Sequence, residues 1–154
     1  KKGVEIAALG PPPVNRIHPH YGVFSPVRGE YIALVAQAPL PAALAQCPRA
    51  FDIGVGTGVL SAVLARRGVA RVIATDQDGR AIACARENIA RLGLADRIEV
   101  RREPMLRRLP SLGEQHVEEL VLGVQLRRSA KRGLSRARAA RRFTPVAGSG
   151  HVVV

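Results

Sequence analysis

The residues with the clearest capacity for chemistry lie at positions 52–58, where the sequence reads DIGVGTG. Glycine at every second position lets the chain turn sharply, and it lets a ligand approach the backbone without a Cβ atom in the way. The flanking patterns predict a short strand over 50–53 and a helix over 59–67. A helix that begins directly after such a loop presents unpaired backbone amides. The context therefore predicts a site for a nucleotide-like ligand, in preference to a glycine-rich turn that binds nothing.

The spacing of the glycines indicates which nucleotide-like ligand fits. Enzymes that bind a dinucleotide such as NAD use G-x-G-x-x-G at the same place, and counted from Gly54 the third glycine would fall at Val59. Counted from Asp52, the pattern is acidic-x-G-x-G-x-G. A carboxylate beside the loop would repel a pyrophosphate, but it would attract a ligand with an ammonium and a sulfonium group. The residues favour S-adenosylmethionine as the cofactor.

A second carboxylate, Asp76, follows the next predicted strand, 71–75, and lies 18 positions after Gly58. A carboxylate at a strand end can accept two hydrogen bonds from vicinal ribose hydroxyls. The alternative is a cap or turn residue, although Asp78 is the better helix cap of the two. We expect Asp76 to bind ribose.

Short apolar runs alternate with longer amphipathic ones between residues 50 and 100. A helix is expected after Asp78, with Gly93 as its C-terminal cap, and a third strand over 97–100. The order strand, helix, strand, helix, strand predicts parallel strands with right-handed crossovers. The expected fold class is α/β, a Rossmann-like doubly wound parallel sheet that is incomplete after the third strand.

Residues 1–49 are expected to form an N-terminal arm and short helices that cover the cofactor site. Residues 1–19 contain Gly-Pro-Pro-Pro at 10–13, which favours an extended arm or linker. Residues 31–45 fit two short helices that meet at Pro39 and Pro41.

The chain of 154 residues carries a net charge of +12, and 12 basic against 4 acidic residues lie in 101–154. We expect this Arg-rich segment to be either disordered or not native to the preceding fold. A basic nucleic-acid-binding module is an alternative function that rests on this segment alone, and a charge run is more often a solvated face.

The cysteine content and the hydropathy of the sequence indicate in which cellular compartment the protein is expected. Two cysteines, Cys47 and Cys84, are too few for a disulfide framework, which favours a reducing, cytoplasmic location. No apolar run approaches eighteen residues, so no membrane insertion is expected. His18-Pro19-His20 has no Cys or acidic cluster beside it, so no metal site is expected.

Residues 51–60, 72–76 and 81–94 resemble class I S-adenosylmethionine-dependent methyltransferases of the small-domain type. That group includes glutamine methyltransferases of release factors and several ribosomal RNA methyltransferases. Residues 21–30 are similar to the segment that such proteins carry before the first strand, where it helps cover the cofactor. The resemblance spans about residues 19–100.

The resemblance implies roles for seven residues. The methionine moiety would be held by Asp52 and the loop, the ribose by Asp76, and Gln77 would lie near the adenine. The cofactor-binding loop residues are Gly54, Gly56, Thr57 and Gly58.

The residues that would bind the methyl acceptor cannot be identified from the resemblance. Relatives continue to an acidic residue after the third strand and to Asn or Asp followed by Pro-Pro, which aligns the acceptor nitrogen. Here Glu103 is a weak stand-in for the acid, and no Pro-Pro pair follows Pro13. No catalytic residue can be named, and the methyl acceptor is an unidentified protein, RNA or small molecule.

The alternative to an active enzyme is a truncated cofactor-binding fragment without activity. Several expected features disappear together near Arg101, which suggests a truncation, a fusion or a shifted reading frame at that point. Only 120–124 and 152–154 beyond it resemble strands.

Overall fold

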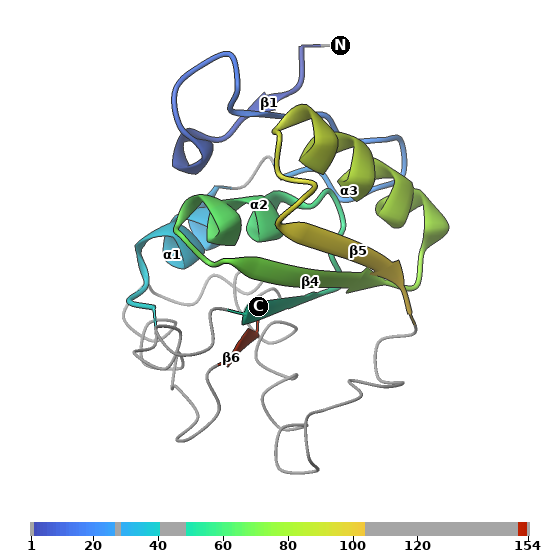
Figure 1. The fold of residues 1–154 in the computed structure, drawn as a ribbon. Helices are drawn as coiled ribbons and strands as arrows, with labels where there is room; N and C mark the ends of the chain where they lie inside the picture. The colour runs from blue at the N-terminus through green and yellow to red at the C-terminus, as the bar shows by residue number, and fades with distance from the viewer. Residues whose placement is uncertain (1, 27–28, 41–48, 104–150, 154) are drawn as a thin grey trace.

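The computed structural model describes residues 2–26, 29–40, 49–103 and 151–153. Its centre is a parallel sheet with the strand order β5-β4-β3-β6 (Figure 1). The strands are β3 (Arg49–Ile53), β4 (Arg71–Asp76), β5 (Ile98–Arg102) and β6 (His151–Val153). The first three strands and their order confirm the predicted βαβαβ unit.

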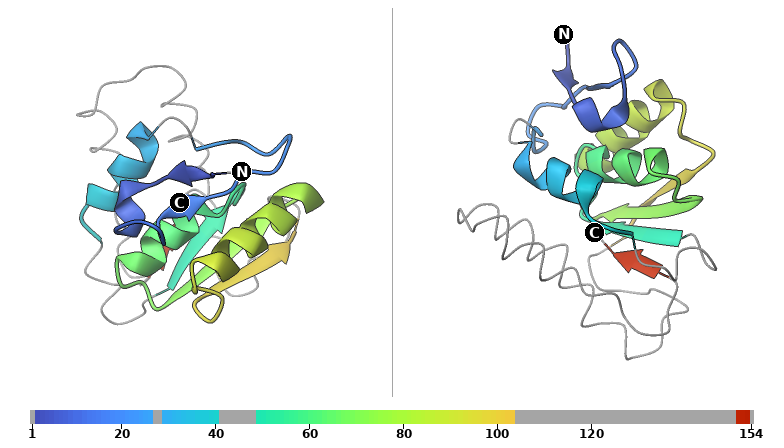
Figure 2. Two further views of the ribbon diagram at one scale, coloured as in Figure 1. Left: turned by 90° about the horizontal axis from the view of Figure 1, so that it is seen from above. Right: turned by 90° about the vertical axis from the view of Figure 1, so that its left-hand side faces the viewer.

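Three helices lie on one face of this sheet, as the views from above and from the side show (Figure 2). They are α1 (Glu30–Gln37), α2 (Val59–Arg66) and α3 (Gly79–Arg91). Because α2 and α3 connect adjacent parallel strands and lie on the same face, both crossovers have the same hand. The described residues therefore have the Rossmann-like α/β arrangement expected from the sequence, without a completed sheet.

The core consists of Ala, Val, Ile and Leu side chains packed between the sheet and the helices. Every residue of α2 except Arg66 is buried. A helix that is apolar on all sides needs a cover on the face turned away from the sheet. The N-terminal residues and α1 provide that cover.

The N-terminal residues are more structured than the predicted arm. They form β1 (Val4–Glu5), η1 (Ala7–Leu9) and β2 (Arg16–Ile17), and the two strands pair antiparallel. Ile6, Leu9 and Ile17 are buried in the core. The prediction of an arm or linker was wrong here, because elements of two and three residues are too short to produce a hydrophobic period.

The predicted caps of α3 are confirmed. Asp78 precedes the helix, and its Oδ1 accepts a hydrogen bond from the backbone N–H of Arg80 at 2.9 Å. Gly93 follows the helix with φ of 67°, in the left-handed region that glycine favours. α1 ends before Pro39, as predicted, and the second expected helix lies in 41–48, outside the described residues.

The end of the unit differs from the prediction in two respects. β5 continues through Arg101 and Arg102, which pair with Thr75 and Asp76 of β4, so the third strand is longer than expected. His151–Val153 form a short strand parallel to β3, which agrees with the strand candidate at 152–154 but adds the end of the Arg-rich segment to a sheet that was expected to stop at the third strand. The strand candidate at 120–124 lies outside the described residues.

Candidate cofactor site

The glycine loop leads from the end of β3 into α2. Gly54, Gly56 and Gly58 have φ values of 78°, 55° and 81°, all in the left-handed region that L side chains rarely adopt. The loop lies at the carboxyl ends of two neighbouring parallel strands, where ligands bind in open α/β sheets. Each glycine is thus required by the backbone path of the turn.

Hydrogen bonds from the loop to β4 fix its position. The backbone N–H groups of Gly54 and Val55 both donate to the carbonyl oxygen of Thr75, at 2.7 and 2.9 Å. The loop begins as a continuation of the sheet, which limits its freedom before any ligand arrives.

The carboxylate of Asp76 contacts the loop directly, so the structure brings these two predicted parts of the site together. Its Oδ2 accepts from the N–H of Gly56 at 3.1 Å, and its Oδ1 accepts from the N–H of Asp78 at 3.0 Å. The side chain is half-buried. A carboxylate has about four lone-pair sites, so two amide donors leave room for ribose hydroxyls.

Asp52 lies beneath the loop and is fully buried. Its Oδ2 accepts from the hydroxyl of Ser61 at 2.7 Å and from the N–H of Ser61 at 3.2 Å. Ser61 is the third residue of α2, whose N-cap, Gly58, has no side chain that could cap the helix. Asp52 thus supplies the missing cap of α2 from the preceding strand.

The loop has one packed side and one open side. A Cβ atom on Gly58 would come within 3.4 Å of Ala85 in α3, and Thr57 is buried. A Cβ atom on Gly56 would meet only the Gly54 carbonyl oxygen, at 4.0 Å, among the described residues. A ligand can therefore approach the backbone at Gly56.

Gln77 and Glu103 lie close to the ends of β4 and β5. Gln77 is exposed, and its carbonyl oxygen accepts from the Nε of Arg102 at 3.3 Å. The N–H of Glu103 donates to the carbonyl oxygen of Asp76 at 3.0 Å. Both residues are thus at the same sheet edge as the glycine loop.

Two residues that join the loop to its surroundings escaped the sequence analysis. One is Ser61, the partner of Asp52. The other is Asn88, a fully buried residue of α3 whose Nδ2 donates to the Thr57 carbonyl oxygen at 3.1 Å. The sequence did offer a signal for Asn88, because a polar residue there falls on the apolar face of an amphipathic helix. Ala85 lies three positions before it and Ile89 directly after it, and both are buried.

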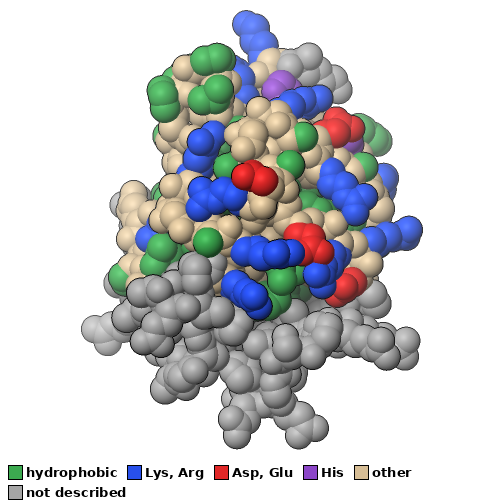
Figure 3. Space-filling view, in the orientation of Figure 1, with side chains coloured by type: hydrophobic (Ala, Val, Ile, Leu, Met, Phe, Trp, Pro, Cys, Tyr) green, Lys and Arg blue, Asp and Glu red, His purple; other side chains and the backbone are tan. Residues whose placement is uncertain are grey.

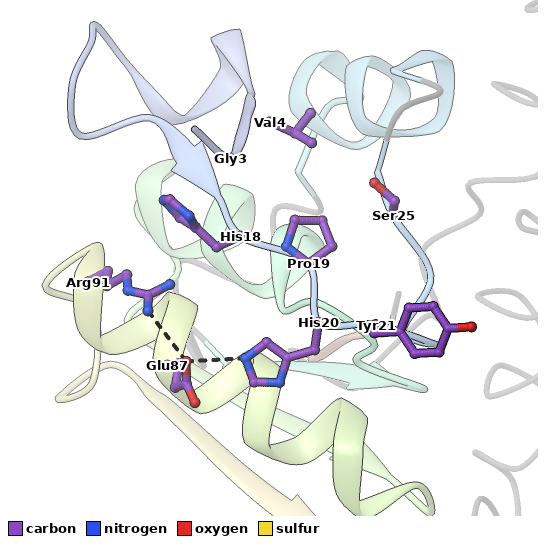
Figure 4. A pocket seen from close by; sticks show the side chains of 9 residues that line it. All are labelled: Gly3, Val4, His18, Pro19, His20, Tyr21, Ser25, Glu87 and Arg91. Atoms are coloured by element: carbon purple, nitrogen blue, oxygen red, sulfur yellow. Dashed lines mark hydrogen bonds and ion pairs between the residues drawn. The ribbon is translucent and has the colours of Figure 1, made fainter. Parts of the chain in front are cut away.

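A separate cavity of about 740 Å³ lies between the N-terminal segment and α3 (Figure 4). His18 and His20 line it from one side, and Glu87 and Arg91 from the other. The Nε2 of His20 lies 3.1 Å from the Oε2 of Glu87. No cluster of metal ligands is formed by the described residues, and the histidines act as contacts to the helix.

Basic side chains gather over β4, β5 and α3, with acidic side chains between them (Figure 3). Glu99 accepts from Arg101 and from Arg71, at 2.6 and 2.8 Å. These hydrogen bonds, with that of Arg101 the larger contribution, lower the pKa of Glu99 to about 2. Part of the positive charge of this face is therefore neutralised within the protein.

The fold places the chain among Rossmann-like α/β proteins, and comparison with known proteins identifies the family. A family profile described as ribosomal protein L11 methyltransferase (PrmA) matches residues 39–121, which is more than half of the chain. The chain belongs to this family of class I methyltransferases. The match continues beyond residue 100, where the resemblance found in the sequence ended.

Individual relatives align over shorter stretches than the family profile. Ribosomal protein L11 methyltransferase of Alkaliphilus metalliredigens is 49% identical over 51 residues, which is 33% of this chain and 16% of that protein. The tRNA1(Val) (adenine(37)-N6)-methyltransferase of Parabacteroides distasonis is 44% identical over 55 residues, or 36% of this chain and 23% of that protein. The aligned part covers only 16% to 24% of the first four relatives.

Among solved structures, human methyltransferase 10 domain containing protein is similar with a TM-score of 0.47 and 16% identity, over 75% of this chain and 64% of that one.

Within the part of the chain that the structure describes, no helix has the length and apolar character needed to cross a bilayer.

Proposed function

We propose that this chain binds S-adenosylmethionine at the glycine loop and serves in methyl transfer to a protein or RNA acceptor. The observation that carries the proposal is the contact between the loop and Asp76, in which the Gly56 amide and the carboxylate meet beside open space. The bound cofactor would supply an electrophilic sulfonium methyl group.

The donor set of the site suits this cofactor. The open backbone at Gly56 would receive the methionine moiety, and the remaining lone pairs of Asp76 would accept the ribose hydroxyls. Gln77 would lie beside the adenine. Asp52 would favour the positive charges of the ligand from beneath the loop, while holding the start of α2 through Ser61.

The same contacts argue against a dinucleotide. A pyrophosphate needs unpaired amides at the loop, but the Gly56 N–H already donates to a carboxylate. An anionic ligand would have to displace the Asp76 carboxylate from the Gly56 N–H and would then lie beside a group of the same charge. Val59, at the place of the third glycine of the dinucleotide fingerprint, is buried in the core.

The acceptor is proposed by analogy with the relatives, whose names specify ribosomal protein L11 in one group and tRNA in another. No acceptor-binding or catalytic residue is assigned, since the described residues supply only the cofactor side of the site. A cytoplasmic location is the prediction that the low cysteine content favours.

Amide hydrogen exchange on the full chain, with and without S-adenosylhomocysteine, tests the location of the site. S-adenosylhomocysteine, the product that S-adenosylmethionine leaves after methyl transfer, should slow exchange in peptides that cover 54–58 and 76–77, because bound ligand shields those amides. Slowing confined to peptides outside these two segments would contradict the proposed site.

A further inference from the structure

Residues 18–22, which we call the strap, run along α3 toward its N-terminus. His18 lies beside Asn88, and the N–H of His20 donates to the Sγ of Cys84 at 3.4 Å. A Cβ atom on Gly22 would lie 3.0 Å from the Nη1 of Arg80. Each step of two residues along the strap therefore corresponds to a step of about four residues along α3.

This correspondence follows from the geometry of the two elements. Between His18 and His20, two extended residues span roughly 6.6 Å, against about 6 Å for four helical residues. Beyond His20 the chain turns: the N–H of Val23 donates to the His20 carbonyl oxygen at 3.1 Å, and Gly22 has φ of 79°. The strap thus reaches the side chain of Arg80, in the first turn of α3. It brings the fully exposed Tyr21 to that end of the helix.

The side chain of Asn88 joins the strap to the glycine loop. Its Oδ1 accepts from the N–H of His18 at 2.8 Å, and its Nδ2 donates to the His18 carbonyl oxygen at 3.2 Å. The same Nδ2 donates to the Thr57 carbonyl oxygen at 3.1 Å. The Sγ of Cys84 lies 3.5 Å from Nδ2 as a third, weaker acceptor, so the amide group contacts both segments at once.

Burial gives these hydrogen bonds their importance. Asn88 is fully buried, so water cannot replace a partner that moves away. Asparagine also favours helices less than the apolar residues around it, which makes it a poor choice for packing alone. Displacement of the strap would take from the Oδ1 of Asn88 its donor, and displacement of the loop would replace an oxygen acceptor of Nδ2 by the weaker Sγ of Cys84.

Cys84 provides a contact to the strap that does not extend to the loop. Burial raises the pKa of its thiol, so the protonated Sγ can donate to the His18 carbonyl oxygen, 3.5 Å away. Asn88 therefore contacts both the strap and the glycine loop, whereas Cys84 contacts the strap but not the loop.

We propose that Asn88 is a positioning residue that couples cofactor binding at the glycine loop to the seating of the strap. The inference rests on the proposed function. Because such coupling is reciprocal, cofactor binding should stabilise the strap, and loss of the Asn88 contacts should weaken cofactor binding.

The test measures the affinity of the full chain for S-adenosylhomocysteine in wild type, Asn88→Ala and Ile89→Val. Ile89 is the buried neighbour of Asn88, and its truncation removes packing in the same helix turn while the hydrogen-bonding groups of Asn88 remain. At a temperature where circular dichroism shows all three folded, Asn88→Ala should weaken binding about tenfold and Ile89→Val less than about twofold. Asn88→Ala should also speed exchange of the His18 and His20 amides.

Each result has a distinct meaning. Equal affinities of the two variants, with wild type binding normally, would overturn the coupling and leave the proposed function intact. Absence of binding by wild type would overturn the proposed function and the coupling with it. If Asn88→Ala does not fold, wild-type exchange decides: slower exchange at 18–20 with ligand supports the coupling, and unchanged exchange contradicts it.

Discussion

At the scale of single residues, Asp76 has two separable tasks, since it holds the Gly56 amide and has lone pairs left for a ligand. Asp76→Ala should weaken the binding of S-adenosylhomocysteine by about 1.5–3 kcal/mol, the range for hydrogen bonds to charged groups. Calorimetric titration measures the change. Asp96→Ala, in the exposed turn before β5, is the control and should leave the affinity unaltered. An unchanged dissociation constant for Asp76→Ala would restrict this residue to shaping the loop.

Gly56 and Gly93 form a matched pair for a second test. Both have left-handed φ values, 55° and 67°, and neither has a close obstacle to a Cβ atom among the described residues. Substitution of either by Ala should therefore lower the free energy of unfolding by about 1–2 kcal/mol. Only Gly56→Ala should also impair cofactor binding, because its methyl group would occupy the open side of the loop. Equal affinities of the two variants would place the ligand elsewhere.

The sequence predicted the loop, both strand-end acids and the helix cap, because these depend on local spacing. It did not predict that Asp52 would cap α2 through Ser61, since that contact requires the strand and the helix to be folded together. The role of Asn88 is equally non-local, with partners 70 and 31 positions away.

At the scale of elements, β4 and β5 are joined by side chains as well as by the backbone ladder. Arg71 from β4 and Arg101 from β5 both donate to Glu99 and lower its pKa from 4.5 to about 2. Because the folded pKa is depressed, this contribution to stability is complete above about pH 4.5 and is lost as the pH falls toward 2. The carboxylate is 37% exposed, so solvent screening limits the contribution to about 0.2–1 kcal/mol.

Urea unfolding of wild type and Glu99→Gln at pH 6 and pH 2.5 measures this contribution. The variant should be less stable at the higher pH, and the difference should shrink at the lower one. A difference that is the same at both pH values would mean that the ion pairs contribute nothing, and a Glu99 carboxyl titrating near 4.5 by NMR would agree with that result.

The predicted elements with a clear hydrophobic period match the structure within one or two residues, as α2 and β4 illustrate. The pairs of residues that make β1 and β2 have no such period. They flank η1, which packs against α2, a helix that lies more than forty positions later in the chain.

At the scale of the whole molecule, the N-terminal segment is part of the core. Ile17 is fully buried, so Ile17→Ala should lower the free energy of unfolding by about 2–5 kcal/mol. Val14→Ala, at a side chain that is 50% exposed, should change it by less than about 0.5 kcal/mol. Denaturant unfolding of the two variants measures this difference. Equally small losses of unfolding free energy in both would favour an N-terminal segment that is only loosely attached.

Calorimetric titration of the full chain with S-adenosylhomocysteine and, in parallel, with NAD tests the central claim most directly. The contact between Asp76 and the Gly56 amide favours a ligand with positive charge and ribose hydroxyls over a pyrophosphate. The account predicts saturable binding of S-adenosylhomocysteine at one site and no heat of binding for NAD. Tighter binding of NAD, or no binding of S-adenosylhomocysteine by the folded protein, would contradict it.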